Sequence, residues 1–65
     1  MTSKEINQVM ATLELSPAEF ARALGVPIQS LYNWRKGIRT MSLGQERAIE
    51  LLLLHPDTAK ELSQL

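Results

Sequence analysis

Residues 15–37 read LSPAEFARALGVPIQSLYNWRKG, and this stretch decides the fold because it predicts two short helices joined by a tight turn. Ser16, Pro17 and Glu19 supply an N-cap, a proline suited to the first helical position and the acidic partner of a capping box. Gly25 should end this first helix, because glycine readily takes the left-handed conformation that reverses the chain. The chain is therefore expected to turn back sharply at this point.

A second helix is predicted from near Pro27 to about Lys36, with Gly37 ending it. Leu31 and Trp34 are three residues apart, so both side chains should point back toward the first helix. Trp34 is therefore assigned to the core, with its ring NH near the surface, rather than to stacking on a nucleic-acid base.

The side chains left on the outer face of this second helix are rich in amides. Gln29, Asn33 and Lys36 follow one another at offsets of four and three, with Ser30 and Tyr32 beside them. A glutamine or asparagine side chain presents a donor and an acceptor together, which is what bidentate recognition of adenine in the major groove requires. The pattern favours a surface that contacts DNA bases.

The segment from Leu15 to about Leu54 resembles the helix-turn-helix of the phage lambda Cro and repressor family, also called the XRE family. The landmarks that match are Leu15-Ser16, Glu19-Phe20-Ala21, Leu24-Gly25-Val26, Leu31, Trp34 and Gly37. The resemblance implies an all-α, compact bundle of four to five short helices that binds double-stranded DNA. It also implies base contacts from the start of the recognition helix and its next turn. The residues it places there are Ile28, Gln29, Ser30, Tyr32 and Asn33.

Three positions depart from the pattern of that family. Pro17 stands where members often have a glutamine that touches a phosphate, so this contact is missing. Arg35 replaces the usual acidic residue after the tryptophan position, and Ile28 stands at a frequent serine or arginine position. An isoleucine donates no hydrogen bond but can pack on a thymine methyl group. The changes at Ile28 and Arg35 therefore bear on which DNA sequence is read.

The distribution of charge matters more than its sum. A formal net charge of zero argues against nucleic acid, because lysine and arginine supply most of the non-specific affinity. However, every charged residue between Phe20 and Gln45 is basic, and all seven acids lie outside that window. A solvated surface would be the simpler interpretation without the adjoining motif. The residues assigned to phosphate or groove contacts are Arg22, Tyr32, Arg35, Lys36 and Arg39.

Tyr32 has three interpretations. Its hydroxyl can bond a phosphate, its ring can touch a base, or the side chain merely covers Ile28. A phosphate or groove contact is preferred.

The flanking segments predict further helices around one core. A helix over about 3–13 carries apolar residues at the three-four-three spacing of a buried stripe. Another begins after Ser42 and extends to about Leu54, because the residue before Pro56 disfavours helical geometry. A short last helix is expected over about 57–64. The stripe of the first helix consists of Ile6, Val9, Met10 and Leu13.

A chain of 65 residues has room for one small domain. We therefore expect residues 1–65 to form a single unit, with the helix-turn-helix at about 16–36. The leucine-rich helices at about 43–65 should serve the core and a dimer contact.

The helix before Pro56 is more apolar than so small a core requires. We expect Leu54 to lie near the polar side, and we expect Leu62 and Leu65 of the last helix to pack back on the bundle. A two-fold dimer would then read two half-sites about one helical turn apart, roughly 34 Å. The residues expected to face inward are Ala48, Ile49, Leu51, Leu52 and Leu53. The residues assigned to the dimer contact are Leu53, Leu54, Leu62 and Leu65.

No catalytic residue, metal ligand or cofactor site is predicted. The chain has no cysteine, and its single histidine, His55, has no ligand partner at a suitable spacing and is read as a helix-end residue. There is no phosphate-cradling glycine loop and no evident pair of carboxylates. An enzyme therefore has almost no support.

The sequence also favours a cytoplasmic protein of bacterial or phage origin. Residues 1–5 lack the pattern of a signal peptide, and the leucine run over 51–54 is far too short to span a bilayer. The absence of cysteine suits a reducing compartment.

Two functions remain. The first is a homodimeric repressor or autoregulator that binds an inverted-repeat operator through the major groove. The second is a protein-interaction module, such as a small antitoxin, whose main role is to bind a partner protein. Gln29, Asn33 and Lys36 favour DNA, whereas Ile28 and Tyr32 keep the protein partner open.

Overall fold

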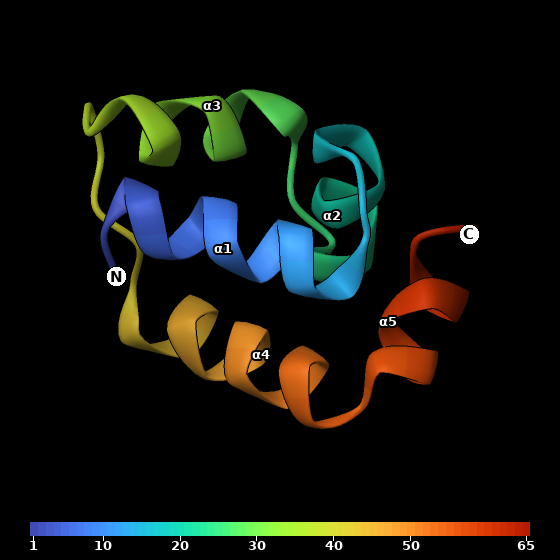
Figure 1. Cartoon of the computed structure of the whole chain (residues 1–65). Helices are drawn as coiled ribbons and strands as arrows, with labels where there is room; N and C mark the ends of the chain where they lie inside the picture. Colours follow the sequence, from blue (N-terminus) through green and yellow to red (C-terminus); the bar gives the residue numbers. More distant parts are fainter.

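Five helices follow one another without a strand in the computed structural model, which describes residues 1–65 (Figure 1). The helix α1 runs through the middle, with α3 along one side of it and α4 along the opposite side (Figure 1). The helices α2 and α5 pack on each other at one end of the bundle. The expected all-α bundle is therefore confirmed. The helices are α1 (Ser3–Leu13), α2 (Pro17–Leu24), α3 (Ile28–Lys36), α4 (Leu43–Leu54) and α5 (Pro56–Leu62).

Three of the helices begin with a capping box, and the box of α2 is the one predicted above. In the box of α2 the backbone N–H of Glu19 donates to the Ser16 hydroxyl at 3.3 Å, and the N–H of Ser16 donates to the Glu19 carboxylate at 2.9 Å. Each box satisfies two N–H groups that the helix leaves without a partner. These local bonds explain why the starts of the helices could be placed correctly. The pairs are Thr2 and Glu5 for α1, Ser16 and Glu19 for α2, and Ser42 and Gln45 for α4.

The last helix is displaced from its predicted position. It begins at Pro56, because proline suits the first helical position and lacks the N–H that would have no partner there. It ends at Leu62 instead of continuing to about Gln64. The Ser63 hydroxyl donates to the carbonyl of Lys60 at 2.7 Å and closes the last turn.

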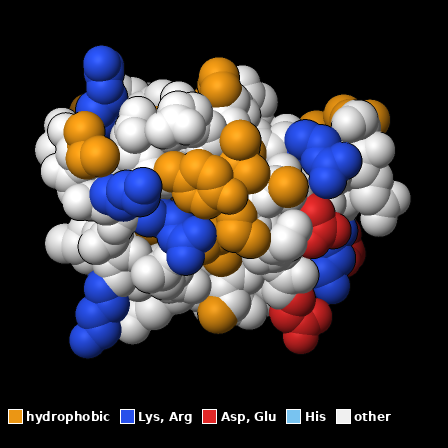
Figure 2. Space-filling model, turned by 90° about the horizontal axis from the view of Figure 1, so that it is seen from above, with side chains coloured by type: hydrophobic (Ala, Val, Ile, Leu, Met, Phe, Trp, Pro, Cys, Tyr) orange, Lys and Arg blue, Asp and Glu red, His pale blue; other side chains and the backbone are white.

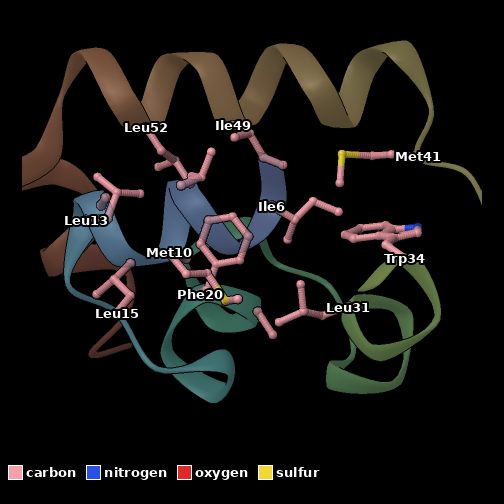
Figure 3. Close-up of a cluster of buried hydrophobic side chains, with 14 residues drawn as sticks. Ile6, Met10, Leu13, Leu15, Phe20, Leu31, Trp34, Met41, Ile49 and Leu52 are labelled. Carbon is pink, nitrogen blue, oxygen red and sulfur yellow. The ribbon is translucent and has the colours of Figure 1, made fainter. Parts of the chain in front are cut away.

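A single cluster of fourteen buried hydrophobic side chains holds the helices together (Figure 3). Phe20, Leu31 and Ile49 are completely buried, and they come from α2, α3 and α4 respectively. Trp34 is only 6% exposed, so its assignment to the core is confirmed. Figure 3 shows Trp34 and Met41 together at one end of the cluster. The buried stripe predicted for α1 is also present.

The inward arc predicted for α4 is too broad. Leu51 is 59% exposed and Leu53 is 36% exposed, whereas Ile49 and Leu52 are buried. A helix that packs by one side buries a stripe of residues three and four apart, so neighbours one position away turn outward. The expectation that Leu51 and Leu53 face inward is therefore wrong.

The packing of the last helix also differs from expectation. Leu65 is 87% exposed and lies beyond the end of α5, so it does not pack on the bundle. Ala59 is completely buried instead, and Leu62 packs partly against the core. Ala23 of α2 is buried as well, and small side chains such as these allow α5 and α2 to approach closely.

The structure contains no helix that combines the length and the apolar character needed to cross a bilayer.

The capping box of α2 should make the stability of the fold decrease at acidic pH. Hydrogen bonding from the backbone N–H of Ser16 is the main cause that lowers the pKa of the Glu19 carboxyl below its ordinary value. A carboxyl with a lowered pKa stabilises the fold above its unfolded pKa, and this stabilisation is lost as the pH falls through the folded value. Glu19→Gln keeps a capping partner, as Gln45 does in α4, without a titrating group.

We expect the melting temperature of Glu19→Gln, followed by circular dichroism, to fall less than that of the wild type between about pH 7 and about pH 2. Glu61→Gln removes an exposed carboxyl outside the capping boxes and serves as the control. A decline as steep as that of the wild type would show that the Glu19 carboxylate adds nothing to the fold.

Candidate nucleic-acid interface

A tight turn of three residues, Gly25 to Pro27, sets the direction of α3 relative to α2. Gly25 has a φ of 73°, in the left-handed region that favours glycine. The backbone N–H of Val26 donates to the carbonyl of Ala21 at 3.1 Å, which closes the end of α2. Val26 also packs partly against the core. The start of α3 is thereby fixed to the body of the domain.

The buried side of α3 determines which residues face outward. Leu31 and Trp34 pack into the core, and they anchor the helix against α1 and α2. Gln29 and Lys36 are exposed, while Asn33 is half-buried. The three residues that the sequence places on the outer face are thus all reachable from solvent.

Two of these side chains are hydrogen-bonded to each other. The Gln29 Nε2 group donates to Asn33 Oδ1 at 3.2 Å, across one turn of α3. This bond leaves the Gln29 Oε1 acceptor and the Asn33 Nδ2 donor free. The pair therefore keeps one free acceptor and one free donor on successive turns of α3, which are the two kinds of group that hydrogen-bond to adenine in the major groove. The spacing of the two amides is predicted from the sequence, whereas the bond between them is seen only in the structure.

The loop after α3 is tied to the same helix. The carbonyl oxygen of Asn33 accepts from the backbone N–H of Ile38 at 2.9 Å and from that of Arg39 at 3.4 Å. Gly37, with a φ of 75°, allows the chain to leave the helix in this direction. Arg39 is consequently held beside the C-terminal end of α3.

The cations near this face are free of acidic partners. No carboxylate lies within 4.0 Å of them, whereas Arg47 and Lys60 are in ion pairs with Glu50 and Glu14. Figure 2 looks onto the side of the molecule that carries α3 and shows Lys and Arg on both sides of the view, with Asp and Glu only at one edge. A phosphate would therefore not have to displace an acid. The four cations are Arg22, Arg35, Lys36 and Arg39.

The same face carries hydrophobic side chains. Ile28 and Tyr32 are each 39% exposed, and Ile38 is 67% exposed. Figure 2 shows hydrophobic groups gathered near the centre of this view. The face is therefore a mixture of amides, cations and apolar groups.

One polar contact on this side was missed by the sequence reasoning. Arg35 Nε donates to Asn7 Oδ1 at 2.9 Å, which joins α3 to α1. Asn7, Tyr32, Arg35 and Lys36 line a hollow of about 340 Å³. No local pattern reveals this pair, because 28 residues separate the two partners.

The residues predicted for a dimer contact differ in exposure and border different hollows. Leu54 is 72% exposed, but Leu62 is half-buried and lines an apolar groove of about 350 Å³ between α2, α4 and α5. Leu53 borders a different hollow, together with Val9 and Glu50. The exposed leucines at the end of α4 and beyond α5 are therefore the ones available for such a contact.

His55 lies beside the apolar groove, and no group of three or more His, Cys, Asp or Glu side chains is arranged to hold a metal ion. Comparisons of the chain with protein-family models, curated proteins and solved structures found no match. The structure shows a small five-helix domain and assigns it to no family.

Proposed function

We propose that this protein is a sequence-specific DNA-binding regulator that inserts α3 into the major groove. The observation that carries the proposal is the orientation of α3. Burial of Leu31 and Trp34 turns the bonded amides Gln29 and Asn33 outward, among cations that have no acidic partners. The resemblance of residues 15–54 to the lambda Cro and repressor family supports the same function.

The proposed contacts follow from the place of each side chain. Gln29 and Asn33 read base edges, with Ser30 and Ile28 at the start of the same helix. Lys36 binds a phosphate from the last turn of α3, Arg39 does so from the loop that follows, and Arg22 does so from α2. The proposal assigns no catalytic residue and no cofactor.

We further propose that the protein acts as a homodimer on an inverted repeat, in the manner of a repressor or autoregulator in the bacterial cytoplasm. The helices α3 and α4 lie on opposite sides of α1 (Figure 1). A contact through the outer face of α4 alone would point the two α3 helices in opposite directions. The two-fold axis must instead lie at a flank or an end of the bundle.

The end that carries α5 meets this condition. Leu54 is the last residue of α4, and Leu65 follows α5, so both exposed leucines lie toward this end. The Cα atoms of one chain span 29 × 20 × 19 Å. Two copies placed end to end would bring their centres to a separation comparable with one turn of B-DNA, roughly 34 Å.

A protein-interaction module is the second candidate, and one observation favours it. Ile28, Tyr32 and Ile38 expose apolar surface on the face that would enter the groove. Base edges other than the thymine methyl offer little for such groups. An antitoxin-like module that binds a partner protein through this face would bury all three apolar side chains.

Selection of binding sites from random duplex DNA tests the main proposal. We expect recovery of an inverted repeat that the protein prefers over a scrambled duplex by a factor of about a thousand or more. Failure to enrich any sequence would reject DNA reading and favour the protein-interaction module.

Gln29→Ala and Lys36→Ala should have different effects on the selected duplex. Loss of the Gln29 amide should relax discrimination at one base position and cost about 1–3 kcal/mol there. Loss of Lys36 should weaken all sequences alike and reduce the salt dependence of binding by about one unit. Fluorescence anisotropy at several salt concentrations, on the selected and scrambled duplexes, measures both effects. Equal losses on every sequence for both variants would refute the assignment of Gln29.

Leu54→Glu should produce a folded monomer with much weaker binding to the inverted repeat, because a buried carboxylate at the contact would lack a partner. Leu43→Glu is the matched control, since Leu43 is 66% exposed at the other end of α4. Sedimentation equilibrium measures the mass of each variant. An unchanged dimer mass for Leu54→Glu would exclude Leu54 from the contact.

A further inference from the structure

We infer that Asn7, Tyr32, Arg35 and Lys36 form a binding pocket for a single phosphate group, which places a residue of α1 in the DNA interface. The identity of the phosphate as part of the DNA backbone rests on the proposed function. The pocket itself rests on the arrangement of these four side chains.

The central contact is the bond from Arg35 Nε to Asn7 Oδ1, at 2.9 Å. A guanidinium has five N–H donors, and this bond uses only the one on Nε. The two terminal nitrogens remain free, and their planar fork matches two oxygens of a phosphate. Asn7 thus holds the guanidinium in one orientation without taking up its binding edge.

Fixing the guanidinium in advance favours binding. A free arginine side chain loses rotamer freedom when it binds a ligand, and this loss opposes binding. Arg35 is half-buried, whereas Lys36, Arg22 and Arg39 are exposed. Arg35 is therefore the cation of this face whose position is best defined before any ligand arrives.

The surroundings of Arg35 suit an anion. The hollow of about 340 Å³ is lined by two cations, a phenol and an amide, and by no carboxylate. The Tyr32 hydroxyl and the free Nδ2 group of Asn7 are donors, as is the ammonium group of Lys36. The other two hollows differ, because one is apolar and the other is bordered by Glu5 and Glu50.

The location of the pocket fits a phosphate beside the groove. Tyr32 and Lys36 lie on the exposed side of α3, and Arg35 lies on the flank that faces α1. A phosphate bound here would touch both helices at once. It would then fix the tilt of α3 in the groove as well as its depth. The resemblance does not imply this pocket, since that family usually has an acidic residue at the position of Arg35.

Substitutions at Asn7 and Arg35 test the pocket on the selected duplex. Arg35→Gln should reduce the salt slope of binding by about 0.9, the value for one phosphate. Arg35→Lys should keep the slope and lose affinity, because an ammonium lacks the planar fork. Asn7→Ala removes no charge, so it should leave the salt slope unchanged, and its loss of affinity should become smaller when it is combined with Arg35→Gln.

Gln8→Ala is the matched control for Asn7→Ala. Gln8 is also an exposed amide of α1, but it borders the hollow on the side of α4. We expect wild-type affinity from it. Melting temperatures identify any variant that has lost its fold. Equal losses for Asn7→Ala in the wild-type and Arg35→Gln backgrounds would overturn the positioning role of Asn7.

Duplexes with a neutral methylphosphonate at one position at a time locate the phosphate. In each half-site, a methylphosphonate at one position should reduce the affinity of the wild-type protein. The same substitution should not reduce the affinity of Arg35→Gln. Identical profiles for the two proteins would overturn the pocket while leaving the proposed function intact.

A titration with inorganic phosphate, followed by NMR of the Arg35 Nε–H, tests whether the pocket binds a free phosphate as well as a phosphate of the DNA backbone. Phosphate-dependent shifts without binding to any selected or random duplex would support the pocket and reject the DNA-binding function. No response to inorganic phosphate and no binding to DNA would reject both.

Discussion

The burial of Leu31 and Trp34 is the constraint on which the rest of the interface depends. Both side chains come from α3, and both lie in the common core with residues of α1 and α2. Their three-residue separation defines one side of the helix, so the opposite side is defined as well. The outward direction of Gln29 and Asn33 is therefore a consequence of core packing. A core of fourteen side chains in so short a chain makes this orientation costly to change.

The helix α1 has a larger role than its distance from the tight turn suggests. It contacts α3, α4 and α5, and its buried stripe forms much of the core. Its polar side carries Asn7, which bonds to Arg35 of α3. One helix thus determines both the apolar support of α3 and the position of a cation beside it. Any change in the packing of α1 would move both together.

Sequence reasoning succeeded where the determinants are local. The starts of α1, α2 and α4 depend on bonds between residues three positions apart, and the two glycine ends depend on single residues. It failed where packing between distant segments decides. Leu51 and Leu53 are as apolar as Leu52, and only the packing of α4 against α1, α2 and α5 leaves them outside. The Asn7–Arg35 bond could not be predicted from the sequence either, because neither residue belongs to a recognisable local pattern.

The neutral total charge has a physical consequence for how such a face would work. Seven acids and seven cations balance, but the acids lie outside residues 20–45. At distances beyond a Debye length, about 8–10 Å in ordinary buffers, a duplex would experience little net attraction. At contact, the unpaired cations act individually, and no acid forms an ion pair with them. Affinity would therefore depend more on close contacts than on long-range electrostatic attraction. A guanidinium held in one orientation, such as that of Arg35, would then contribute more to affinity than a mobile side chain of the same charge.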